Sequence, residues 1–172
     1  MNIRRRVSCV KLAMAGVLGV TAAASAADLE LIYSEIATSP TSVAPGALDL
    51  KGQPMTALFT AINSLSVRVQ SDEWVVRGIT DAGSDLANIL IRGTGSSGTM
   101  WIQEGQPLQG GGAKGELYDF FDDPPVSWNS TGVIGYSFRA KGGATTDNEK
   151  IATFDGTTHS IVMQQGDPLI VF

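Results

Sequence analysis

A short segment that runs from an apolar stretch into a Gly-(Gln/Asp)-Pro-(Leu/Met) turn occurs three times in the chain. The copies are Trp101–Leu108, Val162–Leu169 and, with a looser match, Leu48–Met55. Their glycines are 53 and 61 residues apart, slightly above the spacing of propeller-type repeats. We therefore interpret the chain as a repeat protein, and the recurring segment as part of its scaffold.

The residues of this turn indicate how each strand ends. Gly105 and Gly166 can adopt a positive φ, and the proline two positions later holds the residue before it in an extended conformation. Pro107 and Pro168 lack the N–H group that a central strand requires. The pattern predicts a strand that stops at the glycine and leaves the sheet at an edge.

Residues 1–26 have the layout of a secretory signal peptide. Arg4 to Arg6 and Lys11 are basic, Leu12 to Ala23 is apolar, and Ala24-Ser-Ala26 fits a small-residue cleavage site. The alternative is a membrane anchor, but the 12 residues of the apolar run are fewer than the roughly 20 that cross a bilayer. We expect a mature chain that starts near Ala27, lacks a transmembrane helix, and is secreted or held in the cell envelope.

Charge and cysteine content exclude several functional classes. Without residues 1–26, the chain has 8 basic and 17 acidic residues and a net charge of −9. Such a chain repels phosphate backbones, so nucleic-acid binding is not expected. The one cysteine, Cys9, lies in the leader, which leaves no thiol for a disulfide in the mature chain. About 146 residues suffice for one domain held together by its core.

The order of apolar runs and turns predicts antiparallel meanders in tandem. Alternation and β-favouring residues predict strands, and the Gly-, Asp- and Asn-rich segments between them predict turns. Residues 86–91 are apolar on both faces, which predicts a strand covered on both sides. The expected strands are residues 29–36, 54–65 (where helical spacing competes), 74–80, 86–92, 99–103, 134–139, 150–154 and 159–164.

We divide the mature chain, residues 27–172, into a partial unit at about 28–55, a unit at about 56–108, a linker at 109–126 and a unit at about 127–169. Residues 116–126 are acidic, aromatic and interrupted by proline without a clear period, which favours an irregular loop. The expected fold is all-β, an incomplete β-propeller-like array. Closed propellers have 4–8 blades, so we expect these 172 residues either to belong to a longer protein or to complete their sheets by self-association.

The segment Asn129-Ser-Thr-Gly132-Val-Ile-Gly-Tyr136, followed at the end of its unit by Gly166-Asp-Pro168, resembles a bacterial family. These are exported tandem-repeat proteins named for an Asn-x-x-Gly-x-x-Ala-Phe motif, of the choice-of-anchor type. Asn129 and Gly132 match the motif, whereas Gly135 and Tyr136 replace Ala and Phe. The resemblance implies a β-propeller-like fold and export, and no particular activity.

Two motifs suggest chemistry but have simpler interpretations. His159 has no second histidine or mature-chain cysteine with which to bind zinc, and no Gly-x-Ser-x-Gly elbow accompanies it, so we expect a surface or strand histidine. Gly93-Thr-Gly-Ser-Ser-Gly98 fits the letters of a dinucleotide fingerprint. That motif requires a following helix, and a strand is expected here, so we interpret it as a hairpin loop.

The strongest candidate for a site is the acidic and aromatic stretch 116–123. Its members are Glu116, Asp119, Asp122 and Asp123, with Tyr118, Phe120, Phe121 and the nearby Trp128. Paired carboxylates beside aromatic rings could hydrolyse or bind a sugar, and oxygen ligands could hold calcium. The alternative, which we favour, is an acidic loop whose aromatics fill the space between two sheets. Asp81 and Asp85 are interpreted as turn formers.

No residue is assigned as catalytic, cofactor-binding or metal-binding. We expect an exported structural or binding module of the cell envelope or extracellular space. The alternative is an extracellular carbohydrate-active enzyme that uses residues 116–123. A glycosidase needs two carboxylates held rigidly across a cleft, and crowding on one loop does not favour that arrangement. Self-association and a glycan ligand stay open as interactions.

Overall fold

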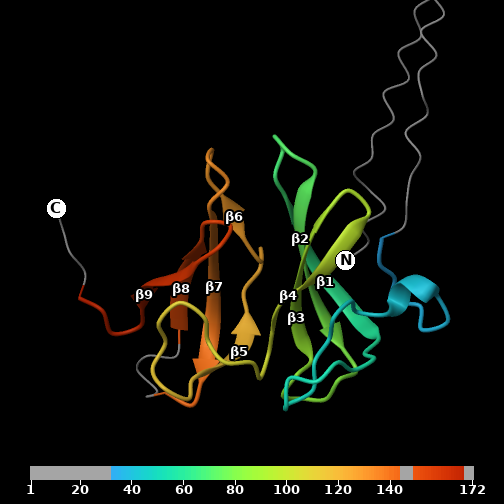
Figure 1. Cartoon of the computed structure of the whole chain (residues 1–172), viewed down its shortest axis with the longest axis horizontal. Coiled ribbons are helices and arrows are strands. Elements are labelled where there is room, and N and C mark those ends of the chain that lie inside the picture. Colours follow the sequence, from blue (N-terminus) through green and yellow to red (C-terminus); the bar gives the residue numbers. More distant parts are fainter. Residues whose placement is uncertain (1–31, 144–148, 169–172) are drawn as a thin grey trace, which may run out of the picture.

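The computed structural model describes residues 32–143 and 149–168. This part of the chain is all-β, with two antiparallel sheets that stand side by side (Figure 1). A short 3-10 turn, Pro40–Ser42, precedes the strands. The expected signal peptide and the apolar residues 169–172 lie outside the described residues.

The first sheet is a four-stranded meander in the order β1-β2-β3-β4. Its strands are β1 (Phe59–Val67), β2 (Glu73–Thr80), β3 (Asn88–Thr94) and β4 (Ser97–Gln103). The inner strands have apolar side chains on both faces of the sheet. In β3, Ile89, Leu90 and Ile91 are all buried. The prediction of a strand covered on both sides is confirmed.

The second sheet contains β5, β7, β8 and β9 in that order, with β6 paired to β7. Its strands are β5 (Leu117–Phe121), β6 (Ser127–Trp128), β7 (Ile134–Lys141), β8 (Glu149–Phe154) and β9 (His159–Gln164). In β7, Ile134, Tyr136 and Phe138 are buried and alternate with less buried neighbours, as the sequence predicts. The two sheets therefore form the tandem meanders that we expected.

Two apolar clusters place the first sheet in the middle of the molecule. One cluster lies between the sheets and joins Val75, Leu90 and Ile102 to the aromatic residues of β5, β7 and β8. The other lies on the opposite face, where Ala44 and Ala57 of the N-terminal segment pack with buried residues of β1, β2 and β3. Both faces of the first sheet are thus covered, which removes its apolar side chains from water.

Two predictions about local structure are wrong. Residues 32–36 form no strand, because Ile32 and Tyr33 pack as side chains against the first sheet instead of joining its ladder; Tyr33 lies 5.2 Å from Phe59 between ring centroids. Residues 117–121 form β5 instead of an irregular loop. A register shift between Tyr118 and Phe120 breaks the period of this strand, which is why alternation does not reveal it. For residues 54–65, the strand interpretation holds from Phe59 onward.

The three turn glycines have the positive φ that the sequence predicts, at 74° for Gly52, 79° for Gly105 and 97° for Gly166. After Gly105 the chain runs antiparallel to the start of β5. The Gly105 N–H donates to Tyr118 O at 2.8 Å, and the Tyr118 N–H donates to Gln106 O at 3.0 Å. The turn that ends the first sheet is therefore bonded directly to the edge strand of the second.

The hairpins β3–β4 and β8–β9 have the same register. Leu90 pairs with Ile102 and Ile91 with Met100, with a register shift between the two pairs. In the second sheet, Ile151 pairs with Met163 and Ala152 with Ile161, with a register shift at the same place. Each residue of the first hairpin thus has a counterpart 61 positions later in the second.

Candidate functional site

Three of the four acidic residues of 116–123 are tied by ion pairs to different strands of the fold. Glu116 is buried and lies 3.3 Å from Lys150 Nζ of β8. Asp119 pairs with Arg139 of β7 at 2.6 Å. Asp123 pairs with the buried Arg77 of β2 at 2.8 Å and also accepts a hydrogen bond from Ser64 of β1. These three carboxylates thus bind cations on three different strands.

The fourth carboxylate, Asp122, borders a hollow that Asp123, Ser137 and Ile151 also line. Its backbone N–H donates to Ser137 O at 3.4 Å. Among the carboxylates of this stretch, Glu116, Asp119 and Asp123 are held by ion pairs to the fold. A glycosidase mechanism requires two facing carboxyl groups with a sugar between them.

The aromatic residues of this stretch fill the core. Tyr118 and Phe121 are fully buried between the sheets, and Trp128 packs against the same cluster. Phe120 is partly exposed, and the guanidinium carbon of Arg77 lies 4.3 Å from its ring centroid. The favoured interpretation, aromatics that fill the space between two sheets, agrees with this packing for three of the four rings.

The described residues contain no group of three or more His, Cys, Asp or Glu side chains placed to hold a metal ion. Asp81 accepts a hydrogen bond from the Leu58 N–H at 2.7 Å, which ties the turn after β2 to the start of β1. Asp85 pairs with Lys141 at 2.9 Å, between the two sheets. Both residues lie in the connection between β2 and β3, but their side-chain contacts are long-range and not the local ones of a turn former.

His159 begins β9 and is buried among aromatic rings. Its imidazole lies 4.5 Å from Phe154 and stacks on Trp101 of the first sheet at 5.6 Å, between ring centroids. Nδ1 is 2.7 Å from the hydroxyl of Tyr136. Burial disfavours the charged imidazolium and lowers the pKa of His159 below 6.5. The histidine is a strand residue, as expected, and its surroundings are those of a core position.

Two of the three glycines in Gly93–Gly98, Gly93 and Gly98, make room for an indole ring. This segment is the β3–β4 hairpin, and a strand follows it, as the sequence predicts. A Cβ on Gly93 or on Gly98 would collide with the ring of Trp74, whose Nε1 donates to Gly95 O at 2.7 Å. Sequence reasoning missed this role because the glycines and the tryptophan lie on different strands.

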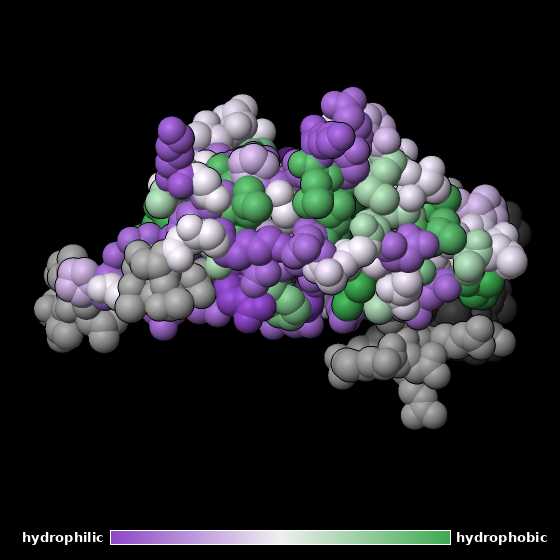
Figure 2. Space-filling model, turned by 90° about the horizontal axis from the view of Figure 1, so that it is seen from below, coloured by the Kyte–Doolittle hydropathy of each residue, from purple (hydrophilic) through white to green (hydrophobic). Residues whose placement is uncertain are grey.

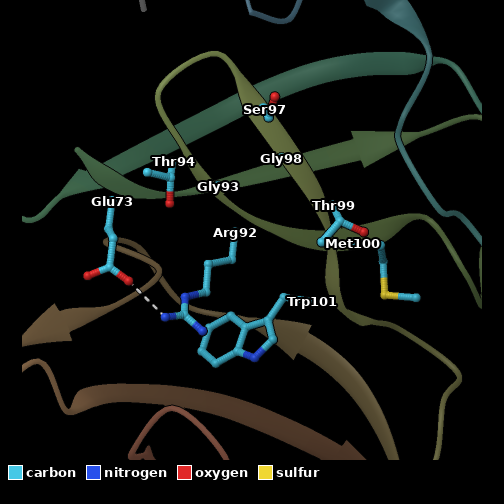
Figure 3. Close-up of a pocket in the computed structure, with 9 residues that line it drawn as sticks. All are labelled: Glu73, Arg92, Gly93, Thr94, Ser97, Gly98, Thr99, Met100 and Trp101. Carbon is cyan, nitrogen blue, oxygen red and sulfur yellow. Dashed lines mark hydrogen bonds and ion pairs between the residues drawn. The ribbon is translucent and has the colours of Figure 1, made fainter. Parts of the chain in front are cut away.

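The same hairpin borders a surface hollow of about 470 Å³ (Figure 3). Arg92 extends there toward both Glu73 and the indole of Trp101, and its Nη2 lies 2.8 Å from Glu73 Oε1. Hydrogen bonds from Arg68 and Arg92 lower the pKa of the Glu73 carboxyl below its ordinary value. Thr94, Ser97 and Thr99 add hydroxyl groups to the lining. An indole, an ion pair and hydroxyls are groups that can contact a polyhydroxylated ligand.

No pattern in the sequence indicates this hollow, because Glu73 and Arg92 lie on neighbouring strands and each resembles an ordinary solvent-facing charge. Seen from below, the surface mixes hydrophilic and hydrophobic areas without one continuous hydrophobic region (Figure 2).

Within residues 32–143 and 149–168, no helix reaches the length and apolarity that a membrane crossing requires.

Comparisons with protein-family models, with curated proteins and with solved structures found no match to this chain. The site can therefore be interpreted only from its own geometry.

Proposed function

We propose that this protein is an exported β-repeat protein that acts as a structural or binding module of the cell envelope or extracellular space. The observation that carries the proposal is that three of the four carboxylates in 116–123 are occupied by ion pairs within the fold. Glu116, Asp119 and Asp123 each pair with a cation on a different strand. Ionisable side chains used in this way hold the strands together, which suits a scaffold better than a pair of carboxyl groups placed around a sugar.

The shared register of the β3–β4 and β8–β9 hairpins supports the repeat interpretation. A register shift at the same position in both hairpins, together with a positive φ at the glycine that follows each, is expected for two copies of one unit. We propose that the two sheets are such copies. Repeat units of this kind bury their apolar faces against each other, which suits a scaffold.

If the module binds a glycan, the hollow beside the β3–β4 hairpin is the position we propose for it. Its indole, ion pair and hydroxyl groups offer one apolar surface and several hydrogen-bonding partners. Glu73 and Arg92 are already paired at 2.8 Å, so a sugar hydroxyl can bond to them without leaving an isolated charge.

A screen of the purified chain on a glycan array, with calcium and with a chelator, tests the binding role. Release of reducing sugar from the same glycans, measured in parallel, tests the enzymatic alternative. We expect no turnover in wild type, Asp119→Asn or Asp123→Asn. Turnover that is lost in either variant would support the carbohydrate-active enzyme instead. Thr94→Trp, which adds bulk at the hollow, should abolish any glycan signal, whereas Thr157→Trp in the β8–β9 turn should not.

Export is tested separately by the N-terminus of the protein recovered outside the cytoplasm. Mass spectrometry should give a chain that begins near Ala27. Recovery of an intact Met1 would contradict the signal-peptide interpretation.

A further inference from the structure

The counterpart residues of the two hairpins differ in what covers them. In the first sheet, Leu90 and Ile102 are 0% and 2% exposed, because the second sheet packs over them. Their counterparts in the second sheet, Ile151 and Met163, are 43% and 50% exposed. The second sheet thus presents to solvent the same pair of apolar positions that the first sheet buries against a neighbouring sheet.

The residues around this pair form a surface of ridges and hollows. Val162, next to Met163 on the edge strand β9, is 56% exposed. On β7 the side chains at this surface are small, so the surface is recessed there. Ser137 pairs with Ile151, and a Cβ placed on Gly135 would contact nothing within 4 Å. Hollows of about 370 and 240 Å³ border this surface, and both are lined by Ser137 and Ile151. We name Gly135, Ser137, Ile151, Val162 and Met163 the outer face of the second sheet.

The charges beside the outer face are of both signs. Arg139 of β7 lies opposite Glu149 of β8 and also pairs with Asp119. Two copies of the outer face brought together would therefore not place a single sign of charge against itself. The face is apolar at Ile151 of β8 and at Val162 and Met163 of β9, and it is low along β7, so the ridge of one copy has a hollow in another copy to enter.

The rest of the described fold limits which part of a second copy could cover the outer face. Both faces of the first sheet are occupied, one by the N-terminal segment and the other by the second sheet. The inner face of the second sheet is occupied by the first. Among residues 32–143 and 149–168, the sheet face left uncovered is the outer face of the second sheet, and a surface that meets itself generates a closed two-fold dimer.

We propose that the outer face of the second sheet is the interface of a two-fold homodimer, in which Val162 and Met163 of each copy pack against Gly135 and Ser137 of the other. The inference goes beyond the proposed function, since it assigns a partner and a surface that a scaffold or binding role does not require. It uses the structural correspondence between the two hairpins and the exposure of the outer face.

The test is the molar mass of the purified chain, measured by light scattering after size exclusion and by sedimentation over a range of concentrations. We expect twice the chain mass for wild type and the mass of one chain for Val162→Lys. The matched control is Val67→Lys on β1, because Val67 is 54% exposed and lies on the edge strand of the other sheet. This control should still form the dimer.

Circular dichroism checks that each variant folds, and Met163→Gln, a milder change on the same face, should shift the equilibrium toward monomer if Val162→Lys does not fold. A wild-type monomer at every concentration would overturn the proposal and leave the face to another partner. A dimer that both Val162→Lys and Met163→Gln leave intact would also overturn it. Neither outcome bears on glycan binding or hydrolysis, so failure here is distinct from failure of the proposed function.

Discussion

The hydroxyl of Tyr136 meets Nδ1 of His159 at 2.7 Å, beneath an indole that comes from the other sheet. Trp101 stacks on the imidazole at 5.6 Å, so the contact between β7 and β9 is also a contact between the two sheets. The neutral imidazole suits this apolar position, whereas a protonated ring would hold a charge away from water. The packing of the sheets is therefore linked to pH.

We expect stability to fall as the pH decreases from about 6.5, since burial lowers the pKa of His159 below that value. In this range the unfolded chain binds a proton that the folded chain does not, so the free energy of unfolding decreases with falling pH until the pKa of the folded state is reached. Above that range the histidine contributes no dependence on pH. Urea unfolding from pH 8 to pH 5 measures the effect.

The control for this prediction is His159→Gln, which keeps a hydrogen-bonding side chain and cannot titrate. Carboxylates such as Glu73, whose pKa is lowered by Arg68 and Arg92, also make the protein less stable in acid. Their effect occurs at lower pH and is the same in wild type and variant. The difference between wild type and variant therefore isolates His159. A difference that stays constant from pH 8 to pH 5 would contradict the prediction.

The buried pair of Glu116 and Lys150 should be costly to break and nearly neutral to replace. Both residues are 3% exposed, and Glu116 Oε2 also accepts from the Ala113 N–H at 2.7 Å. Lys150→Met leaves a buried carboxylate without its cation, for which we expect a loss of about 3–5 kcal/mol. The double variant with Glu116→Leu should recover most of it. Chemical denaturation of wild type, the two single variants and the double variant gives the coupling energy between the two residues. If the effects of the two single substitutions simply add, the residues do not act as a pair.

Asp123→Asn should destabilise the protein more than Asp119→Asn, although both remove one partner of an ion pair. Arg77, the partner of Asp123, has a side chain only 4% exposed, whereas Arg139, the partner of Asp119, is 48% exposed. Asp123→Asn leaves the buried guanidinium of Arg77 with only a weak contact to Asn88. We expect this to lower the free energy of unfolding by roughly 2–4 kcal/mol. Asp119→Asn, which removes the partner of an exposed arginine, should lower the free energy of unfolding by less than about 1 kcal/mol. Equal melting temperatures for the two variants would contradict this ranking.

Gly105→Ala should be more damaging than Gly52→Ala. Both glycines have a positive φ, at 79° and 74°, so alanine is strained at either by about 1 kcal/mol. A Cβ on Gly105 would also lie 2.5 Å from Asp85 O, whereas a Cβ on Gly52 would meet nothing. We expect Gly105→Ala to lower the free energy of unfolding by about 2–4 kcal/mol in total. Similar values for the two variants would show that the contact with Asp85 relaxes freely.

Local pattern was sufficient for the strands whose side chains alternate. Ile134, Tyr136 and Phe138 predict β7, and the Asp155-Gly156 turn predicts the hairpin after β8, as the structure confirms. Pattern failed where tertiary contacts decide. In β5, Asp119 and a register shift give the appearance of a loop, and the cation that neutralises Asp119 is Arg139, 20 positions later in the chain.

The groups around the hollow and the buried ion pair could not be inferred from sequence for the same reason. Lys150 occupies an inward position of an alternating strand, where a charge is unusual, and that is the single local signal of a buried partner. Its partner Glu116 precedes it by 34 residues and lies in a stretch that reads as solvent-exposed acid. Pairings of this kind depend on how the two sheets meet.

The backbone bonds between the turn at Gly105 and the edge strand β5 bear on how the protein unfolds. Tyr118 exchanges hydrogen bonds with Gly105 and Gln106 while its ring lies in the core between the sheets. Melting either sheet alone would break these bonds and expose that core to water, so a half-folded chain retains little of the stabilisation. Heat should therefore be absorbed in one cooperative calorimetric transition, and the slowest-exchanging amides should include Tyr118 at the junction as well as the centres of the sheets.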